Sequence, residues 1–512
     1  MSFSKLVKRY RQWLIVAGII LLAAFLRFYN LPGIFVFGGD EEYQSILAQT
    51  IVRDFHIIWV GVNAAGLGFY LGPFWTYFTA LLLFFSKSDP LVTSFAAATL
   101  GVGTTLLVFF VANKMFGAKA AFVSTLLYAT LPLMVFFDQK YWNPSLVPFL
   151  TLTLVFSIYQ SKKNLWWWTV FAVAFGLVFH IHLSLVPLGF LGAYYFIRQK
   201  GFSNTKILLI SLASFLLVLS PLIAFDYFQK GRNITTPLRF KQVSADPTNK
   251  INPIHHANAL FSTLGRIWYL APNKSNSDEV LFSCTSLSIY GSPTSIDQFS
   301  TRTTAPIWLS IASALLIFYF LRRKETWKDF ASKLVAISLV LVVVPFLFFT
   351  GRAFEYYLLG TFPLILLIPG LLLKDLRGRV YYVALIPFLV LSLLGIHTVL
   401  SATGEYGLVA KKKLVEKVAF FVKDEPFELT QTGVCHAYGG WRYLFVTYGG
   451  ITPERSFTDG SLGWLYPSKI TDKEAKYKVV MSESRAPVDI DVSGTVKKIS
   501  EGGFDAYILE NF

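Results

Sequence analysis

The chain has 512 residues, of which 54% are hydrophobic and only 15% are charged, and its mean hydropathy is +0.53. Soluble domains carry about 25% charged residues, so a water-bounded core cannot hold this much apolar surface, and the composition predicts a multi-pass membrane protein. The formal charge of +16 does not indicate a nucleic-acid partner, because the basic residues form short clusters between apolar runs, as membrane topology requires.

A helix needs about 20 mainly apolar residues to cross the hydrocarbon core. Candidate spans lie near 12–29, 91–113, 118–137, 144–160, 165–182, 183–198, 206–225, 305–321, 333–350, 355–373 and 380–399. The first span follows a basic segment and precedes no small-residue cleavage site, so we expect it to stay as an anchor.

The apolar piece 70–85 decides the topology. If it does not cross, the basic clusters near 5–11, 114–119, 162–163, 198–206, 322–333 and 374–379 all fall on one side, which the positive-inside rule assigns to the cytoplasm. If it crosses, that bias inverts. We therefore expect 70–85 to lie at or dip into the outer interface, which gives about eleven spans, a cytoplasmic N-terminus and an extracytoplasmic C-terminus.

This topology divides the chain into a transmembrane domain at 1–400 and an extracytoplasmic C-terminal domain at 401–512. Long outer loops are expected at 30–90, with juxtamembrane helices, and at 226–305. The tail contains an amphipathic helix pattern, "KKKLVEKVAFFVKDEPFEL", and strand-like runs such as "KYKVVMS" and "FDAYILENF". The predicted fold class is an all-α polytopic membrane protein with a small α/β or β-rich C-terminal soluble domain.

The stretch "FGGDEEYQ" carries the densest acidic cluster, Asp40, Glu41 and Glu42, directly after the first span. Helix capping accounts for part of it: Asp40 suits an N-cap, the two glutamates suit the first turn, and Ile46, Leu47 and Ile51 give an apolar face. A carboxylate fixed at a helix start is also a well-placed base, so capping and chemistry are compatible.

Other ionisable residues collect at the outer ends of the spans, where they would meet the acidic cluster. They are Arg27, Asp138, Lys140, His180, His182, Asp226, Arg352 and Glu355. Each has a structural alternative: the histidines as satisfied interfacial groups, Lys140 as a snorkelling lysine, and Arg352 as the ion-pair partner of Glu355. A base beside cations that can hold phosphate is typical of a transferase site.

The run "RFYNLPGIFVFGGDEEYQSILAQTI" resembles the first-loop signature of GT-C fold polyprenyl-phosphate-sugar glycosyltransferases, and most of all the protein O-mannosyltransferase and aminoarabinose-transferase branch. The similarity extends through "LGPFWTYFTALLLFF" to about Arg198, and "GRAFEYYLLGTFPLILLI" is similar to a later motif of the group. It covers about 200 residues and that segment.

The resemblance implies an inverting sugar transfer at the outer face of the cell membrane, from a polyprenyl-phosphate donor to a protein, lipid or glycan acceptor. Asp40 matches the catalytic Asp and would be the general base, while Glu41 would orient the base or the acceptor. Arg352 and Tyr356 fall in the motif thought to meet the lipid phosphate. The place of Lys140, His180 and His182 at the outer ends of the spans makes them further substrate-binding candidates.

Two departures from the family pattern bear on metal binding. Relatives often carry a Lys/Arg-Pro-Pro-aromatic run where this chain has "GLGFYLGPFWTY", and an acid in the second outer loop where it has "YWNPSL". No metal ligands are therefore predicted and no cofactor is certain, although a divalent metal stays open.

Two other functional classes are alternatives to the enzyme. A transporter or lipid-carrier flippase would place ionisable residues near the bilayer midplane, whereas these spans carry prolines there but no charges. A non-catalytic envelope assembly or sensor protein would need no cavity near the acidic cluster.

The sequence does not decide the role of two features on the outer side, the cysteines and the sequons. Cys284 and Cys435 would both lie outside the cytoplasm, so a bridge between loop and tail is an option. The sequons at Asn233 and Asn273 carry meaning only in a host that modifies them.

Overall fold

The computed structural model describes residues 3–64, 69–199, 201–236, 253–270, 305–349, 354–402, 404–423, 425–432, 439–456, 474–484 and 488–511. Arg352, the sequon at Asn273 and both cysteines, Cys284 and Cys435, lie outside these residues, so their predicted roles have no structural counterpart here.

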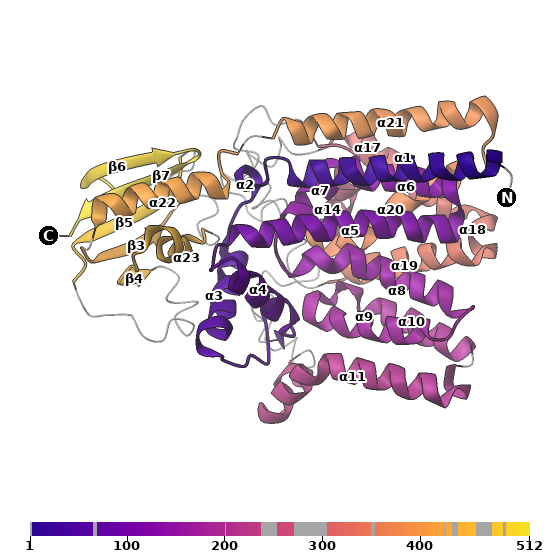
Figure 1. The fold of residues 1–512 in the computed structure, drawn as a ribbon, viewed down its shortest axis with the longest axis horizontal. Coiled ribbons are helices and arrows are strands. Elements are labelled where there is room, and N and C mark those ends of the chain that lie inside the picture. Colours follow the sequence, from indigo (N-terminus) through magenta and orange to yellow (C-terminus); the bar gives the residue numbers. More distant parts are fainter. Residues whose placement is uncertain are drawn as a thin grey trace.

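Apolar helices of different lengths lie side by side and form a bundle (Figure 1). They are α1 (Phe3–Phe28), α5 (Leu91–Phe116), α6 (Ala118–Thr130), α7 (Pro132–Gln139), α8 (Val147–Ser161), α9 (Trp167–Ile181), α10 (Pro187–Arg198), α11 (Thr205–Phe228), α17 (Ile307–Arg322), α19 (Phe330–Leu347), α20 (Phe362–Leu373) and α21 (Gly378–Leu400). Within the described residues, six helical stretches are long and apolar enough to cross a membrane, and the bent pair α6–α7 is a seventh candidate. The multi-pass helical architecture is confirmed, while the figure of eleven spans stays a prediction.

The α6–α7 pair bends by 60° at Pro132. Proline has no N–H and its ring crowds the preceding turn, so carbonyls at the end of α6 lose their helical partners. Arg27 of α1 replaces those partners by donating to the carbonyls of Tyr128 at 3.0 Å and Ala129 at 3.1 Å. Its guanidinium also lies 2.7 Å from the buried carboxylate of Asp138. These two rim charges therefore pair with each other and fix the bend.

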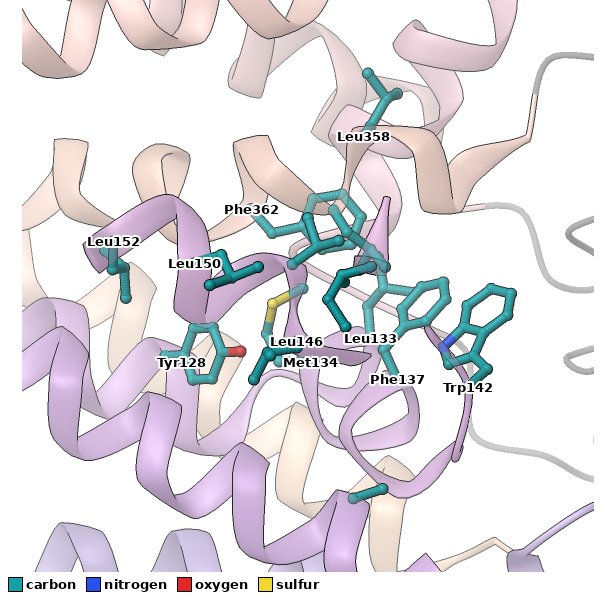
Figure 2. Packing of buried hydrophobic residues seen from close by; sticks show 14 of the residues in the cluster. Tyr128, Leu133, Met134, Phe137, Trp142, Leu146, Leu150, Leu152, Leu358 and Phe362 are labelled. Carbon is teal, nitrogen blue, oxygen red and sulfur yellow. The ribbon is translucent and has the colours of Figure 1, made fainter. Parts of the chain in front are cut away.

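Behind the bend, buried apolar side chains of α6, α7, α8 and α20 pack together, as Figure 2 shows. The ring of Phe137 lies 6.0 Å from Phe362 and 6.1 Å from Trp142. Phe137 thus holds Trp142, directly before the turn of η1 (Asn143–Leu146), next to the first residue of α20, where η5 (Glu355–Thr361) ends. Two segments more than 200 residues apart in the sequence meet at this end of the bundle.

The first outer loop folds into short elements at the end of the bundle: α2 (Leu31–Ile34), α3 (Gly39–Asp54), the β1–β2 pair (Asn63–Ala64 and Phe69–Tyr70) and α4 (Phe74–Phe85). With 12 residues, α4 is about 18 Å long, which is too short for a hydrocarbon core of about 30 Å. It packs beside α3 rather than among the long helices (Figure 1). This geometry agrees with the expected non-crossing segment at 70–85.

The C-terminal part forms an α/β unit. Its helices are α22 (Leu408–Val422), α23 (Trp441–Leu444) and the π-helical η7 (Phe445–Gly449), and its strands are β3 (Phe427–Gln431), β4 (Arg455–Ser456), β5 (Tyr477–Glu483), β6 (Thr495–Glu501) and β7 (Phe504–Glu510). The strand order is β4-β3-β5-β7-β6. Strand β3 pairs in parallel with β4 and β5, and β7 pairs antiparallel with β5 and β6. The predicted small sheet domain is present.

The remaining described elements connect these parts: η2 (Leu183–Leu185), η3 (Gly201–Ser203), α12 (Arg232–Thr235), α14 (Pro253–Arg266) and α18 (Lys324–Lys328). The N-terminus lies at one end of the bundle, whereas α3, α4 and the C-terminal unit lie at the other (Figure 1). The acidic motif and the tail therefore share one end of the molecule, as the sequence predicts.

Candidate active site

The acidic motif begins helix α3, but the cap differs from the expectation. Gly38 is the N-cap, with φ −111° and ψ −162°, so Asp40 occupies the second helical position. The helix starts earlier because Glu41 reaches back: its Oε2 accepts the Gly38 N–H at 3.0 Å, which is one half of a capping box. The prediction that Asp40 caps the helix is wrong. The helix itself and its buried Ile46 and Leu47 are confirmed.

The three consecutive carboxylates lie in three different environments. Glu41 and Glu42 are each 1% exposed, whereas Asp40 is exposed. Burial raises the pKa of Glu41, and the ammonium of Lys140, 3.4 Å from Oε1, opposes that shift. Asp40 has no hydrogen-bond or ion-pair partner among the described residues. Of the three, Asp40 alone presents a carboxylate that is free to meet a substrate.

Glu42 points into the C-terminal unit. Its Oε1 accepts the backbone N–H of Tyr443 at 2.9 Å. Burial raises the pKa of Glu42 from 4.5 to about 7, and the Tyr443 N–H and the positive charges of Lys411 and Arg442 act against that rise. Glu42 is thus held by the C-terminal unit, whereas Glu41 is held by Lys140, directly after α7.

Lys140 starts a row of rings that leads from the acidic motif to the later motif. Its ammonium lies 4.8 Å from the centre of the Trp142 ring, a distance at which a cation is attracted to the ring face. Trp142 lies 4.6 Å from Tyr356, and Tyr356 lies 5.6 Å from His182. We call Trp142, Tyr356 and His182 the aromatic row. Three predicted site residues, Lys140, Tyr356 and His182, are therefore linked through Trp142, and Lys140 at one end of this series contacts Glu41.

A buried network of hydrogen bonds joins α3, α4 and the η1 turn. Gln44 of α3 donates to the Asn143 side chain at 2.9 Å and accepts from Thr76 of α4 at 2.9 Å. Asn143 in turn donates to the carbonyl of His180 at 3.2 Å. Because buried amides must be paired, these bonds fix α3 to both α4 and the η1 turn. The first turn of α3 is therefore positioned relative to Lys140.

Both ring nitrogens of His180 make hydrogen bonds to the protein backbone. Its Nδ1 accepts the N–H of Phe74 at 3.2 Å, and its Nε2 therefore carries the proton and donates to the carbonyl of Val218 at 2.8 Å. A Cβ on Gly72 would lie 2.1 Å from the same ring. His180 thus ties α4 to α9 and α11, and its predicted substrate contact stays a prediction.

A second buried ion pair lies at the start of η5. Arg266 of α14 and Glu355 are 2.8 Å apart, with exposures of 1% and 3%. The sequence offered Arg352 as the partner of Glu355, but the partner found in the described residues is Arg266. A contact across 89 residues leaves no local pattern, which explains why sequence reasoning missed Arg266.

Sequence reasoning also missed the tail's contribution, above all Lys411. One signal was available: Lys411 falls on the apolar face of α22, three and four residues before the buried Leu414 and Val415. A lysine in an apolar stripe is a candidate for a buried contact.

Within the described residues, no group of three or more His, Cys, Asp or Glu side chains is arranged to hold a metal ion, so no metal ligand is assigned.

Comparison with known proteins agrees with this architecture. Residues 71–225 match the family model for dolichyl-phosphate-mannose-protein mannosyltransferase. No curated protein sequence matches the chain significantly. The fold is similar to a crystal structure of ArnT from Cupriavidus metallidurans bound to undecaprenyl phosphate, with a TM-score of 0.59, 12% identity, and coverage of 96% of this chain and 97% of that chain.

A second solved structure with this fold is the oligosaccharyltransferase from Archaeoglobus fulgidus in the apo form. The TM-score is 0.53 with 13% identity, and the match covers 92% of this chain and 70% of that chain. The expected relationship to GT-C fold transferases of the protein O-mannosyltransferase-like type is confirmed. The family match over residues 71–225 indicates a glycosyltransferase that uses a lipid-phosphate-linked sugar donor, and the two solved structures show the fold.

Proposed function

We propose that this protein transfers a sugar from a polyprenyl-phosphate carrier to a hydroxyl group of an acceptor, with inversion at the anomeric carbon and with Asp40 as the general base. The observation that carries the proposal is the division of labour among three adjacent acids. Glu41 and Glu42 are buried and held by partners, whereas the carboxylate of Asp40 is exposed at the start of a fixed helix.

In the proposed reaction, Asp40 takes the proton of the acceptor hydroxyl as its oxygen forms a bond to the anomeric carbon. The bond from that carbon to the phosphate oxygen breaks on the opposite face, and its electron pair leaves with the phosphate. The donor arrives already activated, so no nucleotide-binding loop is needed. Negative charge grows on the departing phosphate, and fixed cations stabilise it.

Lys140 is a cation in direct contact with this motif, and it is held by Glu41 and the Trp142 ring. We infer that Glu41 orients Lys140 and the first turn of α3, so that cation and base keep a set spacing. The aromatic row gives an apolar and polarisable surface on which a sugar ring can rest. Arg352, from the later motif, is proposed as a second phosphate contact.

We place the reaction at the outer face of the cell membrane. The support is the distribution of basic clusters along the sequence together with the shared position of α3 and the C-terminal unit, at the end of the bundle opposite the N-terminus (Figure 1). Undecaprenyl phosphate is bound in the similar ArnT structure, and a polyprenyl phosphate of this type is the proposed carrier. The acceptor is a protein, lipid or glycan that carries a hydroxyl group.

The donor is tested with purified protein in lipid vesicles and a membrane extract as the source of acceptor. We expect label to transfer from a polyprenyl-phosphate sugar but not from the matching nucleotide sugar, and NMR of the product to give the anomer opposite to that of the donor. Transfer from the nucleotide sugar, or retention of configuration, would contradict the proposal.

Sidedness is tested with single cysteines in a chain whose native cysteines are replaced by serine. Asp54→Cys, at the exposed end of α3, should react with a membrane-impermeant maleimide in intact cells, whereas Lys163→Cys, in the exposed α8–α9 connection, should not. The reverse pattern would put the acidic motif in the cytosol and end the proposal.

A further inference from the structure

A single buried ammonium joins the first outer loop to the C-terminal unit. Lys411 of α22 is 2% exposed. Its Nζ donates to the carbonyl of Phe37 at 2.7 Å and to the carbonyl of Gly439 in the C-terminal unit. The same ammonium lies 4.8 Å from the Trp441 ring centre and 5.3 Å from that of Phe504. One side chain of the tail therefore reaches the backbone three residues before Asp40.

The second attachment lies on the other side of Asp40. The N–H of Tyr443 donates to the buried carboxylate of Glu42, and the Tyr443 ring lies 5.4 Å from that of Phe37. A Cβ on Gly440, whose φ is +69°, would come within 2.9 Å of the Phe37 carbonyl oxygen. The C-terminal unit thus contacts the loop at Phe37 and at Glu42. We call these five residues, Phe37, Glu42, Lys411, Gly439 and Tyr443, the loop–tail joint.

Burying charges at this joint needs an explanation other than stability. Taking a carboxylate and an ammonium out of water is costly, and apolar residues of the same volume often stabilise a protein as well as a buried pair does. What the polar groups add is direction, because the Lys411 ammonium only donates hydrogen bonds, here to two carbonyls, and the Oε1 of Glu42 accepts from the Tyr443 N–H. Such contacts select one register between the loop and the tail. The residues between the two contacts are Gly38, Gly39, Asp40 and Glu41.

We propose that Lys411 and Glu42 are positioning residues: through the loop–tail joint, the C-terminal unit sets the orientation of Asp40 for the transfer reaction. This inference rests on the proposed function, in which Asp40 is the base. It assigns the tail a part in the chemical step itself, apart from any contact with the acceptor. A reacting group displaced by about 1 Å can lose about 100-fold in rate, so loosening the joint should lower kcat more than it changes KM.

The test uses the full-length protein in lipid with three substitutions on one helix. Lys411→Met removes the ammonium but keeps most of the side-chain volume, Lys411→Arg keeps a cation, and Lys413→Met is the matched control because Lys413 is 58% exposed. Amide hydrogen exchange is followed in a peptide that covers residues 35–46 and in peptides from β5 and β7. The transfer assay gives kcat and the KM for the lipid donor.

We expect Lys411→Met to speed exchange in residues 35–46 without changing β5 and β7, to lower kcat about 10-fold to 100-fold, and to leave KM within about threefold. Lys411→Arg should restore most of kcat, and Lys413→Met should behave as wild type. Unchanged exchange in the loop, or faster exchange with unchanged kcat, would overturn the proposal.

A second variant distinguishes local loosening of the loop from general unfolding of the C-terminal unit. Glu42→Ala leaves the Tyr443 N–H without its acceptor and should loosen the same loop peptide while the sheet stays protected. If β5 and β7 lose protection together with the loop in both Lys411→Met and Glu42→Ala, these residues only stabilise the C-terminal unit, and the positioning role is refuted. If the wild-type protein transfers no sugar, the proposed function fails, and the exchange of residues 35–46 alone decides whether the tail holds the loop.

Discussion

Glu42 gives the protein a pH-dependent stability that can be worked out from its surroundings. Burial raises the pKa of Glu42 from 4.5 to about 7, with the Tyr443 N–H and the charges of Lys411 and Arg442 opposing the rise. The folded protein therefore holds this proton over a pH range in which the unfolded chain has released it. The stability that Glu42 contributes is complete below about pH 4.5 and is lost as the pH rises through about 7.

A shift from 4.5 to about 7 corresponds to about 3 kcal/mol of unfolding free energy, at about 1.4 kcal/mol per pH unit. Glu42→Gln removes the titrating proton and keeps an oxygen that can accept from Tyr443. Between pH 4.5 and 7.5, wild type should thus lose about 3 kcal/mol relative to this variant, with no further divergence above that range. Lys411 keeps its charge over most of this interval, since burial lowers its pKa only to about 8.

Denaturant unfolding in detergent at a series of pH values measures this difference. Glu416→Gln is the matched control, because Glu416 lies exposed on α22, and its difference from wild type should stay flat with pH. A wild-type minus Glu42→Gln difference that is constant from pH 4.5 to 8 would refute the reasoning about burial of this carboxyl.

Three further substitutions test the framework around the site. Arg27→Met should destabilise the protein by about 3–5 kcal/mol, because it leaves Asp138 buried without a partner; thermal unfolding measures the loss, and pairing it with Asp138→Leu should recover most of it. Lys140→Met should lower the transfer rate by about tenfold while Lys140→Arg retains most of it, since a cation must stay beside Glu41. His180→Ala should lower the unfolding free energy by about 1–3 kcal/mol, because the Phe74 N–H loses its acceptor.

Each of these expectations has a contrary outcome. An Arg27→Met protein as stable as wild type would mean that the α6–α7 bend does not depend on the buried pair. Equal activity of the Met and Arg variants at position 140 would remove that charge from the reaction. An unchanged unfolding midpoint for His180→Ala would show that its two ring contacts contribute little.

The sequence was most informative where a property is local. The apolar runs predicted where helices lie, and the distribution of basic clusters predicted that 70–85 does not cross the membrane. Both predictions depend on the solvation of short segments. The acidic motif at the start of α3 was also visible. The choice of N-cap was not, because it depends on Glu41 binding back to the Gly38 N–H rather than on the side chain best suited to capping.

The contacts that complete the site are non-local, and they could not be predicted from spacing. Glu42 and Tyr443 are 401 residues apart, and Arg27 and Asp138 are 111 residues apart. The sequence also suggested that charges at the outer rim would face the acidic motif, yet Arg27 and Asp138 pair with each other. In a transporter, buried ionisable groups line a path for the cargo. This pair instead braces a helix bend, which favours the enzyme over that alternative.

The central claim is that the exposed carboxylate of Asp40 accepts a proton in the transfer step. The most direct measurement is kcat for Asp40→Asn in the lipid-vesicle assay, with binding of the lipid-phosphate donor followed in parallel and Asp54→Asn, at the exposed end of the same helix, as the control. The predicted result is a loss of about 10²–10⁴ in kcat for Asp40→Asn, unchanged donor binding, and an Asp54→Asn protein that matches wild type. An Asp40→Asn protein that folds, binds the donor and transfers sugar at the wild-type rate would contradict the mechanism.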